Sequence, residues 1–295
     1  INAFTVSQVR ALESRQLVGL SSANVAGLDA TQIAAITASS IRGLEPVDMA
    51  LLSTAQLLGL QTEQLGALSS AQIGSLTPQV IPLLKQTDIA AISTSGIRGL
   101  TSTQLSRISS QAIAGLEPAL VAALSSAQVS GFHSTQLLLL NSQQIASLNA
   151  SNIRGLSTAQ ITELPAASIP FIDDGAVLGM QAEQLNSFSD GQLAALRAQQ
   201  FGALTTLQLS ALDTRFVGRL SSHQVAALVS SKVTGLSSRQ IGSLSVAAIV
   251  GLDASVLERM NATQVSGLVS AQIATLSIAQ VASFQSRHSS GFNAE

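Results

Sequence analysis

Histidine and serine are the side chains of this sequence whose types could support catalysis, so their spacing is considered first. The histidines are His133, His223 and His288. No two of them have the close spacing of metal ligands, and we expect all three at the surface. The sequence has no G-x-S-x-G, no P-loop and no G-x-G-x-x-G between a strand and a helix. A triad of distant residues stays open, but these observations predict no enzyme, no metal site and no cofactor.

Two further features bear on metals. The run Asp173-Asp174-Gly175 resembles the start of a calcium loop, but it lacks the alternating oxygen ligands and the later glutamate of an EF-hand. We therefore interpret it as a solvated helix start. The chain has no cysteine, which excludes disulfides and thiolate metal sites. This absence fits a cytoplasmic protein or a bacterial secreted one.

Composition narrows the classes of partner. Of the 295 residues, 46% are hydrophobic and only 10% are charged, with a net charge of −2. No basic surplus exists to neutralise a phosphate backbone, which argues against nucleic acid. No apolar run approaches the roughly 18–20 residues of a membrane helix. The chain begins at Ile1 without a methionine, and we expect a segment cut from a longer polypeptide or a chain whose leader has been removed.

An eight-residue repeat dominates the sequence. With octads starting at Thr5, the frame holds to Phe284 without insertion or deletion, which gives 35 octads of consensus S-S/T-A-Q-I-A-G/A-L. Positions 5 and 8 are apolar in all 35 octads, and position 4 is Gln in 20. We predict one repeat domain over 1–284, irregular at 165–180, followed by a non-repeat tail at 285–295.

The octad pattern favours a short helix. A continuous helix would smear the apolar stripe, and Ala, Gln and Leu are poor strand residues. Ser or Thr at position 1 with Gln at position 4 is a capping box, and the apolar residues around it form a hydrophobic staple. Pro46, Pro78 and Pro118 stand at position 2, which is the first helical residue, whereas Pro82 and Pro170 should distort their octads. Glycine at position 7, found in 12 octads, suits a helix end.

A helix this short needs neighbours, because it is unstable alone in water. We therefore predict an all-α solenoid of very short helices, one per octad, with about three to four octads per coil. The motif IRGL recurs at 56-residue intervals and places Arg42, Arg98 and Arg154 at position 6. If the coil brings these arginines to one face, they form a sparse basic line that could bind a partner. The alternatives are ordinary solubilising charges and an old duplication of seven octads.

The repeat x-S/T-x-Q-I/V-x-x-L resembles the octapeptide-type tandem tracts of large proteobacterial secreted or surface proteins, as in LSSAQIGSL at 68–76. This resemblance covers nearly the whole chain and implies an extended stalk, scaffold or adhesive segment. A second resemblance, to the helix starts of TAL-effector repeats, is carried by LTPQVI at 76–81. The roughly 34-residue period and the base-reading positions of that family are absent.

We therefore expect a non-catalytic structural or interaction module, namely an elongated scaffold or stalk of a larger bacterial secreted or surface protein. Its partner would be a protein or the neighbouring domains of a longer chain, because solenoids expose long surfaces for binding. One alternative is a secreted effector segment that binds a host protein or nucleic acid through one face. Another is an ice- or surface-binding array. A cytoplasmic location stays possible, and the oligomeric state is open.

Overall fold

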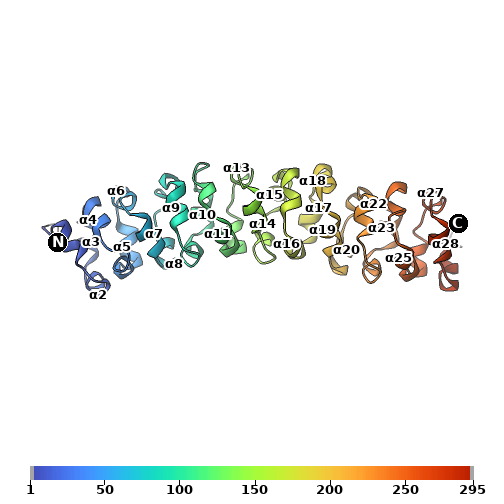
Figure 1. Cartoon of the computed structure of the whole chain (residues 1–295), viewed down its shortest axis with the longest axis horizontal. Helices are drawn as coiled ribbons and strands as arrows, with labels where there is room; N and C mark the ends of the chain where they lie inside the picture. Colours follow the sequence, from blue (N-terminus) through green and yellow to red (C-terminus); the bar gives the residue numbers. More distant parts are fainter. Residues whose placement is uncertain (1–2, 293–295) are drawn as a thin grey trace. The chain divides into compact units, whose positions relative to one another are not determined.

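A computed structural model describes residues 3–292, and helices are the only regular elements in that range. The chain divides into two compact units, Ile1–Leu148 and Asn149–Glu295, which meet at an octad boundary. Within each unit the short helices stack in successive coils, so that helices distant in sequence lie side by side (Figure 1). The predicted all-α solenoid of very short helices is confirmed.

The first unit contains fourteen α-helices and four 3-10 helices. They are α1 (Val6–Arg10), α2 (Ser14–Val18), α3 (Ser22–Ala26), α4 (Ala30–Ala35), η1 (Ile41–Gly43), α5 (Pro46–Leu51), α6 (Thr54–Leu58), α7 (Thr62–Ala67), α8 (Ser70–Gly74), η2 (Ile81–Leu83), α9 (Gln86–Ala91), η3 (Ile97–Gly99), α10 (Ser102–Ser106), η4 (Ile113–Gly115), α11 (Pro118–Ala123), α12 (Ser126–Val129), α13 (Ser134–Leu137) and α14 (Ser142–Ala146). Each octad of this unit thus forms one helical element.

The second unit repeats this organisation. Its elements are η5 (Ile153–Gly155), α15 (Thr158–Glu163), η6 (Ala166–Phe171), α16 (Asp174–Gly179), α17 (Ala182–Asn186), α18 (Asp190–Ala195), α19 (Ala198–Ala203), α20 (Thr206–Ala211), α21 (Thr214–Gly218), α22 (Ser222–Ala226), η7 (Val233–Gly235), α23 (Ser238–Ser243), α24 (Val246–Ile249), α25 (Ala254–Arg259), α26 (Ala262–Val265), α27 (Ser270–Ile273), α28 (Ile278–Ala282) and η8 (Ser286–Gly291). The last of these, η8, follows the 35 octads.

Reciprocal hydrogen bonds start the α-helices. In α8, the Ser69 hydroxyl accepts from the Gln72 backbone N–H at 3.3 Å, and Gln72 Oε1 accepts from the Ser69 N–H at 3.0 Å. The same Oε1 contact to the N–H of position 1 occurs at all twenty octads with Gln at position 4. These glutamines are Gln8, Gln16, Gln32, Gln56, Gln64, Gln72, Gln104, Gln128, Gln136, Gln144, Gln160, Gln184, Gln192, Gln200, Gln208, Gln224, Gln240, Gln264, Gln272 and Gln280. One side chain per octad therefore satisfies an N–H that a helix start leaves unpaired.

The amide nitrogen of the same glutamine has a second role, which the sequence analysis missed. Gln72 Nε2 donates to the carbonyls of Ile41 and Leu44, at 2.9 and 2.7 Å. These acceptors are positions 5 and 8 of the octad four repeats earlier, 31 and 28 residues before the glutamine. Gln240 makes the same pair of contacts with Leu209 and Leu212 in the second unit. The glutamine thus joins successive coils as well as starting its own helix.

These contacts fix the length of a coil. Helices contact partners three octads away, as α1 contacts α4 and α19 contacts α22, whereas the glutamine contacts reach four octads back. The coil therefore holds 3.5 octads, or 28 residues, within the predicted range of three to four. Position 4 of one coil consequently lies against position 8 of the preceding coil.

Octads that lack the glutamine include all those whose helix is 3-10. Each of the elements η1 to η7 has another residue at position 4, and each octad with Gln there forms an α-helix. Proline contributes to this change in two of them. Pro82 lies inside η2 and Pro170 inside η6, where proline has no backbone N–H to donate. Pro46 and Pro118 begin α5 and α11 as predicted, but the octad of Pro78 begins its helix only at Ile81.

Glycine at position 7 corrects one part of the sequence interpretation. The helix does end there, but Gly19 and Gly27 have right-handed backbones, with φ of −78° and −82°, instead of the left-handed conformation of a glycine cap. The reason for many of these glycines is close packing. A Cβ at Gly99 would lie 1.8 Å from the Ser70 carbonyl oxygen of the preceding coil, and one at Gly43 would lie 2.0 Å from that of Ser14.

The array continues into the region predicted as a non-repeat tail. His288 occupies position 4 of an additional octad, and its Nδ1 accepts from the Gln285 N–H at 2.6 Å. Its Nε2 lies 2.9 Å from the carbonyl oxygen of Met260, 28 residues earlier. An imidazole therefore makes the contacts that a glutamine makes elsewhere, and η8 packs on α26. The contacts of the repeat extend as far as Phe292.

Candidate functional site

The three arginines of the IRGL motif are the site residues that the sequence predicts. All three are exposed. Because a coil has 28 residues, Arg42 and Arg98 lie two coils apart on the same side of the first unit. Ser70 lies between them, since Arg42 and Ser70 line one hollow and Gly99 packs on the Ser70 backbone. Arg154 belongs to the second unit, where its Nε donates to the Ala150 carbonyl at 3.3 Å.

The hollow beside Arg42 encloses about 350 Å³. Arg42 Nε donates to the Ala67 carbonyl at 2.9 Å, which holds the side chain against the next coil. The other residues that line the hollow are small or carry hydroxyls, and none is acidic: Gly66, Ala67, Leu68, Ser69, Ser70, Ser93 and Ser95. This site offers one cation and several hydroxyl donors, which suits contact with a carboxylate or another anionic group.

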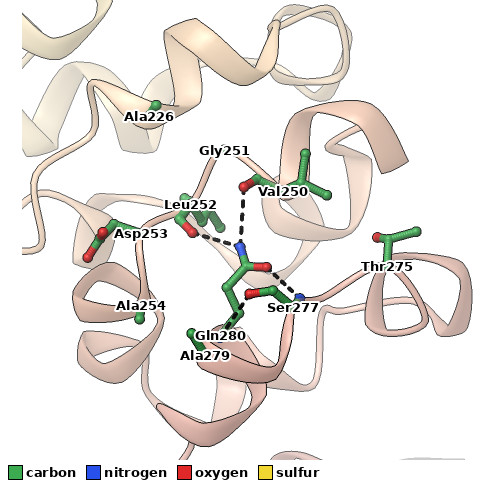
Figure 2. Close-up of a pocket in the computed structure, with 10 residues that line it drawn as sticks. All are labelled: Ala226, Val250, Gly251, Leu252, Asp253, Ala254, Thr275, Ser277, Ala279 and Gln280. Atoms are coloured by element: carbon green, nitrogen blue, oxygen red, sulfur yellow. Dashed lines mark hydrogen bonds between the residues drawn. The ribbon is translucent and has the colours of Figure 1, made fainter.

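A second hollow, of about 550 Å³, lies near the end of the second unit (Figure 2). Gln280 crosses its floor: Nε2 donates to the carbonyls of Val250 and Leu252, and Oε1 accepts from the Ser277 N–H (Figure 2). Small and hydroxyl side chains such as Ala254 and Thr275 complete the lining. The groups that face this hollow are mostly saturated by the chain itself.

Asp253 is the one titratable residue among those that line the second hollow. Its Oδ1 accepts from the Ser255 N–H at 2.8 Å, at the start of α25. Hydrogen bonds from the Ser255 side chain and backbone lower the pKa of the Asp253 carboxyl. It therefore stays ionised at neutral pH, and the hollow contains no second titratable group to act with it in acid–base chemistry.

The structure separates the histidines and corrects one prediction about them. His133 and His223 are exposed, as expected, and stand at the start of α13 and in α22. His288 was expected at the surface, but it is fully buried. The reason is its place at position 4, the position whose side chain reaches back to the preceding coil. The signal in the sequence was that QSRHSSGF, at 285–292, can be aligned with an octad.

We expect His288→Leu to loosen the last helix, because the Gln285 N–H would lose its acceptor and the Met260 carbonyl its donor. Hydrogen exchange of the Gln285 amide, followed by mass spectrometry of the C-terminal peptide, should become at least about tenfold faster. His288→Gln restores the usual residue and should retain protection. Equal protection in the leucine variant would show that the imidazole does not hold η8.

The irregular stretch 165–180 forms two different elements. The octad that begins at Pro165 is the 3-10 helix η6, whereas the next forms a regular six-residue helix, α16. Asp173 caps α16, because its Oδ1 accepts from the Gly175 N–H at 2.8 Å. Asp174 forms an ion pair with Arg197 at 2.7 Å. These contacts agree with the interpretation of this run as a helix start.

Two searches for specialised sites gave no candidate within the part of the chain that the structure describes. Over 3–292, no three His, Asp or Glu side chains come together as ligands for a metal ion. No helix within those residues is both long and apolar enough to cross a lipid bilayer.

Comparison with known proteins identifies a repeat tract. Residues 41–78 match the family model of the ALTTAQ repeat. The letters of that name fit octad positions 7, 8, 1, 2, 3 and 4, where residues 51–56 have LLSTAQ. The match supports a tandem repeat over this part of the chain.

No curated protein matches the sequence significantly. Among solved structures, the chain has a distant likeness to the leucine-rich repeat-containing protein LegL7 from Legionella pneumophila. The two are 13% identical, 84% of each chain is covered, and the TM-score is 0.23. At this TM-score none of that protein's properties is carried over to this chain.

Proposed function

We propose that the chain is a non-catalytic repeat scaffold, which holds neighbouring domains apart and presents its surface to a protein partner. In this proposal it is a stalk-like part of a larger secreted or surface protein of bacteria. The resemblance of the octads to such tracts supports the location, and the match to a repeat family supports the scaffold. The sparse charge, at 10% of residues, fits a structural role.

The observation that carries the proposal is the use of the buried polar groups. Eighteen of the twenty position-4 glutamines are buried, and those with a resolved amide contact donate to the chain's own backbone. Among the described residues, Arg197 Nε is the only buried side-chain nitrogen or oxygen without a hydrogen-bond partner. Catalytic and cofactor sites need polar groups aimed at a ligand, whereas these groups are occupied in joining coils.

Partner recognition then falls to the exposed positions of the octad. The face of the first unit with Arg42, Ser70 and Arg98 is the one we propose for contact with an acidic protein surface. Nucleic acid is the less favoured partner, because the chain has a net charge of −2. Heparin retention of a double variant, Arg42→Glu with Arg98→Glu, would measure how much anion binding this face provides.

A scaffold of this type should hold fixed distances that grow with the number of coils. The chain has no cysteine, so pairs of introduced cysteines can carry spin labels without competition. Ala71 and Ala127 are exposed and two coils apart, and Arg15 lies a further two coils back. At a layer spacing of about 8–10 Å, we expect about 16–20 Å for the first pair and about 32–40 Å for Arg15 with Ala127.

Double electron–electron resonance on Ala71→Cys with Ala127→Cys, and on Arg15→Cys with Ala127→Cys, measures these distances. Narrow distributions that double from the first pair to the second would support a rigid spacer. Broad, overlapping distributions would contradict it, because a flexible chain cannot keep two attached domains at a set separation. The labelled proteins should retain the helical circular dichroism of the unlabelled chain, which controls for disruption by the label.

A further inference from the structure

The last coil of the second unit exposes side chains that are buried in every other coil. From Val9 to Val265, the apolar residue at position 5 is at most 2% exposed in each octad. At the next two octads, Ile273 is 38% exposed and Val281 51% exposed. No position-4 glutamine among the described residues reaches the carbonyls of these octads, because the contact always comes from four octads later. This end therefore presents apolar side chains and backbone acceptors together.

The first coil of the first unit presents the matching groups. Gln8 and Gln16 are exposed, whereas the other eighteen position-4 glutamines are buried. Their Oε1 atoms accept from Thr5 and Glu13, at 2.8 and 2.7 Å, so both side chains are already held in the geometry of the array. Their amide nitrogens have no earlier coil among the described residues to which they could donate. Two oriented donors therefore face outward at this end.

The two ends also match in register. Gln8 and Gln16 are one octad apart, as are Ile273 and Val281. When Gln8 of a second copy lies over the carbonyls of Ile273 and Leu276, Gln16 lies over those of Val281 and Phe284. This is the geometry that Gln72 makes with Ile41 and Leu44 within one chain. The second copy's first coil would also cover the two exposed position-5 side chains.

The size of the contact is sufficient for a specific interface. One coil contains 28 residues, and interfaces of standard size use about 20–30 residues on each side. The contact combines buried apolar side chains with hydrogen bonds to backbone carbonyls, which are the terms that hold neighbouring coils together within the chain.

We propose that a second copy of this chain docks head to tail, with the coil of Gln8 and Gln16 stacked on the coil of Ile273 and Val281. Such a contact joins different surfaces of the two copies and does not close on itself, so association continues to longer oligomers. The proposal goes beyond the scaffold function and stands independently of it. A scaffold that remains monomeric would retain its spacing role.

Sedimentation velocity of the 295-residue chain over a wide concentration range provides the first test. We expect the weight-average mass to rise with concentration beyond that of a dimer. In Gln8→Glu with Gln16→Glu, carboxylates replace the donors that face the carbonyls, and the dissociation constant should rise at least about tenfold. The corresponding lysine variant keeps a donor, as Lys232 does at position 4 when it donates to the Ala203 carbonyl at 3.1 Å, and should retain association.

A mixing experiment tests the direction of the contact. The double glutamate variant blocks one end, and Ile273→Asp with Val281→Asp blocks the other. Each variant alone should be monomeric, whereas an equimolar mixture should form a dimer that grows no further, since only one pair of intact ends remains. Circular dichroism checks that the aspartate variant is folded, and the glutamate variant alone keeps the test valid if it is not.

The matched control is Gln111→Glu with Gln143→Glu, which makes the same charge change at exposed position-3 glutamines away from both ends. It should associate as the unmodified chain does. A chain that is monomeric at all concentrations would overturn the proposal. Association that the control weakens as much as the end variants would overturn it equally, because it would arise from side faces.

Discussion

Gln72→Glu should lower the free energy of unfolding by about 3–5 kcal/mol, because it places an unpaired carboxylate against two backbone carbonyls. Gln72 is 2% exposed, and its Nε2 donates to Ile41 and Leu44 of the preceding coil. Glutamate keeps the Oε1 acceptor that starts α8 but has no N–H to give. Urea unfolding of the variant and the unmodified chain, followed by circular dichroism, measures the difference.

The matched control is Gln8→Glu, at the same octad position but without a preceding coil. Its Oε1 contact with the Thr5 N–H remains, and a negative charge near a helix start is favourable, so we expect a change within about 0.5 kcal/mol. Burial should raise the pKa of the carboxyl introduced at 72. The deficit should therefore be complete above that pKa and shrink as the pH falls towards about 4.3, the unfolded value. Equal losses at both positions would refute the role of the amide nitrogen.

Gly99→Ala should cost about 1–3 kcal/mol, since its methyl group would overlap the backbone of the preceding coil. The new Cβ would lie 1.8 Å from the Ser70 oxygen and 2.8 Å from its Cα, so backbone has to move. The same urea titrations report this loss. Amide hydrogen exchange should locate it in the coils of α8 and η3, which pack against each other.

Gly19→Ala provides the comparison at the same octad position. A Cβ there meets no atom closer than the Gln16 oxygen of its own helix, at 3.4 Å, which is ordinary contact. Because alanine restricts the unfolded chain, this variant should be neutral or more stable by about 0.4–1 kcal/mol. If both alanine variants behave alike, the close approach of coils is not the reason for glycine at position 7.

The fold could be predicted because folding information is written into every octad. Apolar residues at positions 5 and 8, a cap at position 1 and Gln at position 4 define a helix of one to two turns that must stack on others. The coil length was predicted only as a range, because the sequence does not show which groups of one coil meet those of the next. The Nε2 contact of Gln72, which sets 3.5 octads per coil, is a long-range contact without a local signature.

The candidate site could be predicted only in part. The 56-residue spacing of Arg42 and Arg98 correctly placed them on one side of the first unit, two coils apart. That they recognise a partner stays a prediction. Sequence reasoning missed the burial of His288, because histidine at position 4 departs from the consensus and its role depends on the Met260 carbonyl, 28 residues away. It also treated glycine at position 7 by local backbone preference alone, whereas packing between coils explains Gly43 and Gly99.

The coil of 28 residues and the repeat of eight have a consequence for how such an array can change in length. Gain or loss of one octad leaves every glutamine four octads from its acceptors, so the hydrogen-bond network survives. It also rotates all later residues by two sevenths of a turn around the solenoid axis. A recognition surface that spans several coils therefore keeps its pattern only when octads are added or removed seven at a time. Length can drift freely in this architecture, whereas a binding face can be copied only in blocks of 56 residues.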